Sequence, residues 1–224
     1  MPLQNRVTPE GAIIGAAARG RFMGNRGRLH TPDQTLGTSR WTTRAWVTCR
    51  LSFRGRRRTL MAPGRYTELF FLDEAVALAA GHRPCGECRR DAYRAFRDAW
   101  TAATGGTDAT IQQLDGQMHA SRVEPRSRQQ VRHRRSIDDL PDGVFVALPE
   151  RSGMKGAWLL WADRLHLYAP DGYHASVNRP RGGTVDVLTP SVTVAALAAG
   201  YRPEVHPSLG LPAAGDRGLC NRGR

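Results

Sequence analysis

The chain has 224 residues, of which 40% are hydrophobic and 7% aromatic, enough apolar material for one large or two small packed domains. This composition does not point to a disordered, fibrous or disulfide-stapled protein. The formal net charge is +13, so the favoured partner is a polyanion, with nucleic acid ahead of an acidic membrane surface.

The positive charge is concentrated in the first part of the chain. Between residues 40 and 65 there are eight arginines and no acidic residue, which predicts an anion-binding surface in this segment. A solvated basic loop explains such a run equally well. The predicted nucleic-acid contacts are Arg44, Arg50, Arg54, Arg56, Arg57, Arg58 and Arg65.

No segment has the pattern of a signal peptide or a membrane span. The small-residue stretch at 11–18 has no basic segment before it and is far too short to cross a bilayer. We therefore expect residues 1–20 to form a loose extension, the protein to have no membrane partner, and its location to be cytoplasmic. Four cysteines, two of them in a Cys-x-x-Cys pair, favour a metal in a reducing compartment over a disulfide framework.

The N-terminal half combines short extended segments with helices. Extended segments are predicted at residues 21–30, 45–53, 58–61 and 68–72, the first of them a hairpin around a Gly- and Asn-containing turn. Asp73 is placed to cap a helix over 74–80, and Gly81 supplies its left-handed end. Apolar spacing predicts a further helix over 92–100 that docks on this sheet.

The C-terminal half has a different pattern. A helix is predicted over 109–122, followed by a polar and basic segment over 122–135. Turn residues then separate strands predicted at 144–148, 157–161, 165–168 and 185–188. Thr189 followed by Pro190 has the usual order of residues at the start of a helix.

These elements predict an α+β fold in four parts. Residues 1–20 are the loose extension, and residues 21–104 form a small sheet with helices. Residues 105–140 are a helical basic linker, and residues 141–224 form an antiparallel β-rich domain with one helix and a loose tail.

The cysteine pair Cys85 and Cys88 carries the chemistry of the N-terminal part. Two thiolates at this spacing, on a turn that enters a helix, can bind one tetrahedral ion, although a single pair supplies only half of such a site. A thioredoxin-type dithiol needs a strand that leads directly into the motif, whereas a helix and Pro84 precede it here.

The residues around this pair resemble the metal-binding module of Ada, the bacterial DNA methylphosphotriester repair protein. The resemblance is carried by Leu69-Phe70-Phe71, Asp73-Glu74-Ala75, Ala79-Ala80-Gly81 and His82-Arg83-Pro84-Cys85 with Cys88, and by the Gly-Asn segment that runs from Gly24 to His30. It is specific over about twenty residues, loose over 22–67 and absent beyond residue 104.

The resemblance implies a zinc site. Cys85 and Cys88 match the second ligand pair, Cys49 matches the second member of the first pair, and His30 matches its first member. His30 and Cys49 lie nineteen positions apart, whereas the family keeps these ligands close. His82, three residues before Cys85, is the alternative fourth ligand or a hydrogen-bond partner of a thiolate. Further rivals are His119 and Cys220.

We expect from these observations a zinc-binding protein that binds nucleic acid, DNA in particular, with the zinc mainly structural. One alternative is a repair enzyme in which zinc activates Cys49 as a methyl acceptor, and another is a hydrolase that uses His119 and Asp115. A third is a zinc-stabilised protein-interaction module. A nucleobase deaminase is disfavoured, since no glutamate lies two residues after Cys49 or His30.

Overall fold

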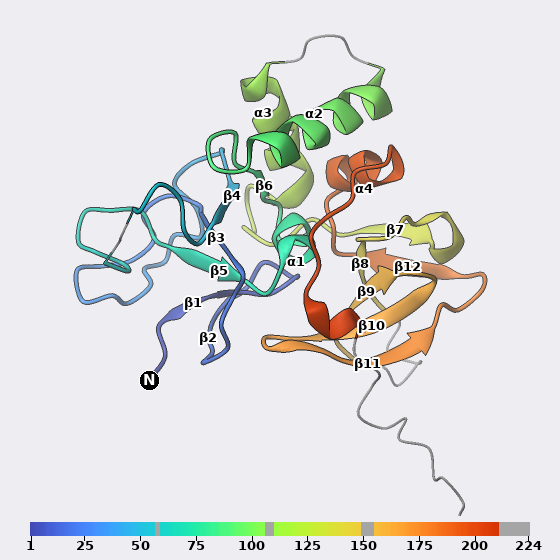
Figure 1. The fold of residues 1–224 in the computed structure, drawn as a ribbon, viewed down its shortest axis with the longest axis horizontal. Coiled ribbons are helices and arrows are strands. Elements are labelled where there is room, and N and C mark those ends of the chain that lie inside the picture. Colours follow the sequence, from blue (N-terminus) through green and yellow to red (C-terminus); the bar gives the residue numbers. More distant parts are fainter. Residues whose placement is uncertain (57–58, 106–109, 149–154, 211–224) are drawn as a thin grey trace, which may run out of the picture.

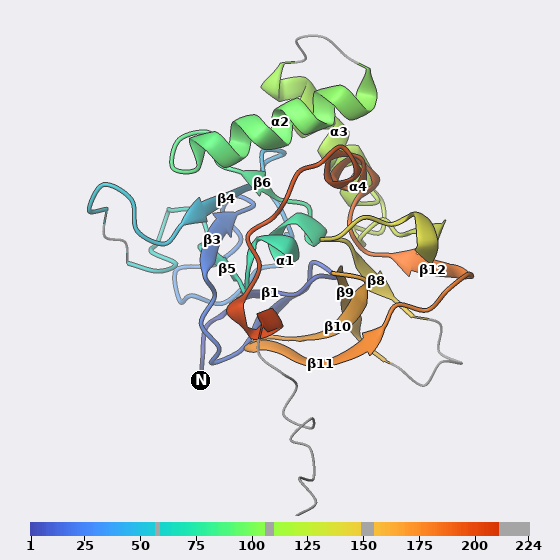
Figure 2. The ribbon, with the colours of Figure 1, turned by 45° about the vertical axis from the view of Figure 1, so that its right-hand side comes forward.

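A computed structural model describes residues 1–56, 59–105, 110–148 and 155–210. Arg57, Arg58 and Cys220, which the sequence analysis named, lie outside these residues. The described part contains two six-stranded sheets, mostly antiparallel, together with four α-helices, so the predicted α+β class is confirmed. In Figures 1 and 2 helix α1 lies at the centre between the two sheets, with α2, α3 and α4 along one side.

The first sheet has the strand order β2-β1-β5-β3-β4-β6. Its strands are β1 (Gln4–Val7), β2 (Ile13–Gly15), β3 (Phe22–Asn25), β4 (Val47–Arg50), β5 (Leu69–Phe71) and β6 (Arg83–Pro84). The pairs β1–β5 and β4–β6 are parallel, and the remaining pairs are antiparallel. The strands predicted around β4 and β5 are therefore confirmed.

Three expectations for this sheet are wrong. Gly24 and Asn25 do not form the predicted hairpin turn, because both lie within β3, which pairs with β4 and β5. Residues 1–20 are not a loose extension, because Val7 of β1 and Ile13 of β2 are buried in the same apolar cluster as Leu69. The strand expected over 58–61 is absent at residues 59–61, of which 60 and 61 lie in a turn. Met61 has a left-handed φ of 49° there, and its N–H donates to the buried Glu68 carboxylate at 2.8 Å.

The second sheet has the order β11-β10-β9-β8-β12-β7, and all its pairs are antiparallel. Its strands are β7 (His133–Ser136), β8 (Phe145–Ala147), β9 (Ala157–Trp161), β10 (Arg164–Ala169), β11 (Gly172–Asn178) and β12 (Thr184–Val187). Strands β7 and β11 were not predicted. The residues of β7 are all polar and give no apolar pattern, whereas β11 alternates Tyr173, Ala175 and Val177 with polar residues, a strand signal that could have been recognised.

The helices are α1 (Glu74–Ala79), α2 (Arg90–Thr104), α3 (Ile111–Arg122) and α4 (Ser191–Ala198). As predicted, Asp73 caps α1 by accepting the Val76 N–H, and Gly81 has a φ of +82° after its end. Helix α2 does not dock mainly on the first sheet, because Phe96 packs against Tyr201 and its neighbours in the α4 region. The Thr189 hydroxyl accepts the Phe145 N–H instead of capping α4.

The two sheets share one hydrophobic cluster. Val7 and Leu69 of the first sheet lie in one cluster with Phe145 and Leu159 of the second. Likewise, the other cluster joins α2 and α3 to the second sheet and α4. The N-terminal and C-terminal parts of the chain therefore stabilise each other through common apolar packing.

A buried ion pair joins three distant segments near the start of α1. The Glu74 carboxylate accepts two hydrogen bonds from Arg89, at 2.8 and 2.7 Å, and both side chains are 1% exposed. The Tyr201 hydroxyl and the Glu204 N–H also donate to Glu74. Because Arg89 directly follows Cys88, this pair anchors the Cys-x-x-Cys turn to the core.

We expect Glu74→Ala to lower the free energy of unfolding by about 3–5 kcal/mol, because it leaves the Arg89 charge buried without its partner. Urea unfolding followed by circular dichroism measures this. Asp98→Ala is the control, since it breaks only the exposed Arg97–Asp98 pair and should cost under about 1 kcal/mol. Equal losses for the two variants would contradict a structural role for the buried pair.

Candidate metal centre

Three cysteines from separate segments meet at the outer edge of the first sheet. Cys49 lies on β4, Cys85 directly follows β6, and Cys88 lies two residues before α2. Their sulfur atoms all lie within 4.8 Å of one another, and each side chain is half-buried with a free thiol. In the described part of the chain they are the one group of this kind placed to hold a metal ion.

Backbone pairing brings the three sulfurs together. Strand β6 runs parallel to β4, with Thr48 opposite Pro84, and the Cys85 N–H donates to the Thr48 carbonyl at 3.0 Å. The chain then turns, and the Arg89 N–H donates to the Cys85 carbonyl at 3.1 Å as α2 begins. This geometry fixes both members of the pair against the strand that carries Cys49.

The three thiols differ in pKa because their surroundings differ. A hydrogen bond from Cys49 lowers the pKa of Cys85 to about 5, and backbone N–H groups of Glu87 and Cys88 act in the same direction. The same hydrogen bond, together with burial, raises the pKa of Cys49, and burial raises the pKa of Cys88. Without a metal, negative charge is therefore favoured at Cys85 over Cys49 and Cys88.

The donor set suits a soft metal ion. Thiolates select zinc, copper(I) or iron–sulfur clusters rather than magnesium or calcium. Zinc–sulfur bonds of about 2.3 Å in a tetrahedron place the sulfurs about 3.8 Å apart. Small side-chain rotations suffice to reach that spacing from separations within 4.8 Å.

The two histidines proposed as fourth ligand are not part of this group. His30 is buried, and its Nδ1 and Nε2 are hydrogen-bonded to the Thr67 hydroxyl and the Ala62 carbonyl at 2.7 and 3.1 Å. His82 is fully buried between aromatic rings, with ring centroids 5.1 Å from Trp46 and 4.6 Å from Phe71. A tetrahedral ion at the three sulfurs would thus take its fourth ligand from elsewhere.

Asp115 and His119 on α3 have other partners. Both carboxylate oxygens of Asp115 accept hydrogen bonds from Arg83, at 2.7 and 2.8 Å, in a largely buried ion pair. The Arg122 guanidinium donates to Nδ1 of His119 at 3.1 Å, so Nε2 carries the ring proton. Burial, followed by the charges of Arg122 and Arg44, lowers the pKa of His119.

The loop after β4 brings one predicted arginine, Arg56, to the turn that carries the cysteine pair. Arg56 pairs with Glu87 at 2.6 Å, which places this loop against the Cys-x-x-Cys turn. In Figures 1 and 2 the β6–α2 turn and β4 lie on the side of the first sheet that faces away from the second sheet. The predicted arginines that the structure describes are all exposed: Arg44, Arg50, Arg54, Arg56 and Arg65.

Two other arginines are buried, although no sequence pattern predicts their burial. Arg26 and Arg122 are 3% and 2% exposed, and their guanidinium carbon atoms lie 4.3 and 3.8 Å from the Trp46 ring centroid. They are almost a hundred positions apart, inside segments whose composition is that of exposed turns and linkers. No local pattern distinguishes them from the many surface arginines of this chain.

Comparison of the chain with protein families, with curated proteins and with solved structures found no match. The likeness to the Ada module therefore rests on the residues quoted above, of which the structure brings Cys49, Cys85 and Cys88 together. Among the described helices, none combines the length and the hydropathy of a membrane span.

We expect the purified protein to bind one equivalent of cobalt(II) or zinc. Each of the substitutions Cys49→Ser, Cys85→Ser and Cys88→Ser should weaken metal binding at least tenfold, because it removes one thiolate ligand. Cobalt(II) titration followed by thiolate-to-cobalt charge-transfer absorption measures the affinity. Cys220→Ser is the matched control and should bind as the unchanged protein does. Full affinity in Cys85→Ser would contradict the site.

Proposed function

We propose that this is a zinc-binding protein that binds nucleic acid, DNA in particular, through the arginine-rich loop beside the metal centre. The observation that carries the proposal is the ion pair between Arg56 and Glu87, which joins an acid-free basic segment to the turn between Cys85 and Cys88. Metal centre and basic surface thus form one continuous region of the molecule.

The position of the cysteines supports a mainly structural zinc. Strand β6 has two residues and pairs with β4 alone at the edge of the sheet. A zinc ion at the three sulfurs would cross-link β4, β6 and the start of α2, and its binding free energy would add to the stability of the fold. Zinc also adds no redox chemistry of its own. Free thiols of this kind require a reducing compartment, which supports a cytoplasmic location.

The loop has the groups that bind a nucleic-acid backbone. Exposed arginines neutralise phosphates and release counterions, so affinity falls steeply with salt. Arg54 and Arg56 lie over the Phe53 ring, at 5.0 and 5.5 Å from its centroid, which presents two guanidinium groups on one aromatic platform. Such a pairing of cations with an aromatic ring supports contacts to both phosphate and base.

One observation favours methyl transfer as a second candidate function. The structure brings three cysteines and no histidine of the described residues into the metal group, and thiolate ligands make zinc-bound sulfur more nucleophilic than a histidine-containing set does. Binding of zinc would displace the proton of Cys49, and the resulting thiolate would attack the methyl carbon of a DNA methylphosphotriester. The new S–CH3 bond replaces the C–O bond, and the phosphodiester leaves as an anion. Mass spectrometry of the protein after incubation with methylated DNA would find one methyl group on Cys49.

The hydrolase alternative loses support, because Asp115 already holds Arg83 with both oxygens. A zinc-stabilised protein-interaction module remains the outcome if nucleic acid does not bind.

We expect duplex DNA to bind at low salt, and the triple variant Arg50→Gln, Arg54→Gln and Arg56→Gln to bind at least tenfold more weakly. If each arginine contacts one phosphate, the slope of log affinity against log salt falls by about 0.9 for each residue removed. Fluorescence anisotropy with a labelled duplex at several salt concentrations measures both quantities. Single-stranded DNA and RNA of the same sequence test the preference for DNA.

The control variant removes three exposed arginines elsewhere: Arg134→Gln, Arg135→Gln and Arg202→Gln. It has the same net charge as the loop variant, and it should keep both affinity and slope. If both variants bind DNA equally weakly, the loss of affinity comes from the lower net charge and not from the loop. Absence of binding at low salt would contradict the proposal and favour the interaction module.

A further inference from the structure

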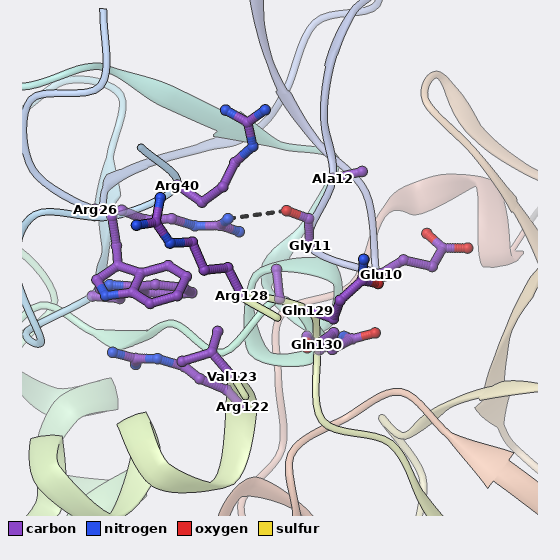
Figure 3. Close-up of a pocket in the computed structure, with 14 residues that line it drawn as sticks. Glu10, Gly11, Ala12, Arg26, Arg40, Arg122, Val123, Arg128, Gln129 and Gln130 are labelled. Atoms are coloured by element: carbon purple, nitrogen blue, oxygen red, sulfur yellow. Dashed lines mark hydrogen bonds between the residues drawn. The ribbon is translucent and has the colours of Figure 1, made fainter. Parts of the chain in front are cut away.

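A cavity of about 260 Å³ lies where the two halves of the chain meet. Its walls come from the β1–β2 turn, the segment after β3, the end of α1 and the segment after α3. Four arginines line it, and Figure 3 shows Arg26, Arg40, Arg122 and Arg128 around the same space. The one acidic residue in its lining is Glu10, whose carboxylate points away from these guanidinium groups in Figure 3.

Arg26 is one of two buried cations in this lining. Its side chain donates from Nη1 to the Gly11 carbonyl at 2.9 Å, as the dashed line in Figure 3 marks. The other two donors, Nε and Nη2, are buried without a hydrogen-bond partner, and Arg26 makes no ion pair with a described acidic residue. The Nε–Nη2 edge of a guanidinium is one that binds two oxygens of a carboxylate or phosphate.

Arg122 contributes a second buried positive charge. It donates to the Gly81 and Arg44 carbonyls at 2.7 and 2.6 Å, and its Nε has no partner. Gly81 leaves the space for this side chain, because a Cβ at position 81 would overlap it. The nearby carboxylate of Asp115 is already paired with Arg83, so it does not neutralise Arg122 in a direct ion pair.

Two buried guanidinium groups on one tryptophan are costly without a counter-ion. Moving a charged group out of water loses its hydration free energy, and an opposite charge nearby is needed to offset that loss. Burial lowers the pKa of Arg26 to about 9, and burial followed by the charge of Arg26 lowers the pKa of Arg122 to about 8. The same two charges, after burial, lower the pKa of the neighbouring His82.

We propose that this cavity binds the phosphate group of a phosphate monoester, with Arg26 as the residue that holds its oxygens. A dianion matches two buried and two peripheral guanidinium groups better than a single carboxylate does. The cavity is several times larger than the roughly 30 Å³ that one water molecule occupies in the liquid. Room therefore remains for the group esterified to the phosphate, next to the half-buried ring of Trp41.

This inference is independent of the proposed DNA binding. The lining contains no cysteine and none of the arginines assigned to the DNA-binding loop. Variants of the metal centre and of the loop should thus leave the cavity functional, and failure of one proposal does not remove the other.

Isothermal titration calorimetry at fixed ionic strength tests the site with inorganic phosphate, thymidine monophosphate and thymidine. We expect saturable one-to-one binding of one or both phosphate-bearing compounds and at least tenfold weaker binding of thymidine. Binding of inorganic phosphate identifies the phosphate group as sufficient, whereas binding of thymidine monophosphate alone shows that the esterified group is required. Binding of neither compound, or equal binding of thymidine, would overturn the proposal.

Arg26→Gln should weaken phosphate binding at least tenfold while circular dichroism shows a folded protein. Because Arg26 also holds the Gly11 carbonyl, a double variant at the cavity mouth, Arg40→Gln and Arg128→Gln, provides a second measurement if Arg26→Gln does not fold. It removes two exposed side chains and should weaken binding at least threefold.

Arg134→Gln with Arg135→Gln is the charge-matched control, and it should retain full affinity, as should Cys85→Ser. The cavity is not the binding site if a folded Arg26→Gln variant keeps full affinity. The same conclusion follows if Arg26→Gln does not fold and the double variant at the cavity mouth binds phosphate as tightly as this control.

Discussion

The buried pair of Glu74 and Arg89 is the interaction on which the rest of the structure depends. It joins the start of α1, the residue after the Cys-x-x-Cys turn, and the C-terminal segment at Tyr201 and Glu204. Two charged side chains are stable in this buried position because each has several hydrogen-bond partners in good geometry. The cysteine group at the surface is therefore tied, through Arg89, to a polar network in the interior.

Charge is distributed in two distinct ways in this molecule. The loop after β4 exposes its arginines to solvent, where they attract extended polyanions and are screened by salt. Arg26 and Arg122 are enclosed beside Trp46, where water does not screen them and a small anion would be bound much more strongly. The two proposed anion-binding sites thus use the same residue type, and they differ in how deeply the arginines are buried.

Local sequence signals predicted the elements that have a recognisable local pattern. The cap at Asp73, the left-handed Gly81 and the strand around Cys49 need only neighbouring residues to be recognised, and the structure contains all three. Strand β1 escaped prediction, because four residues carry too short an alternation and its partner β5 lies more than sixty positions away. The packing of α2 on α4 was not predicted either, because the apolar face of a helix does not indicate which element it packs against.

For the candidate site, the sequence by itself determined which residues have metal-binding chemistry: three cysteines, of which two lie at ligand spacing and the third in a predicted strand. Only the tertiary structure decided that they converge, because the parallel β4–β6 pairing that unites them is non-local. The tertiary structure also decided that both ring nitrogens of His30 are hydrogen-bonded to other groups. Composition predicted an excess of positive charge, whereas burial, which depends on the whole fold, selected Arg26 and Arg122 from thirty-two arginines.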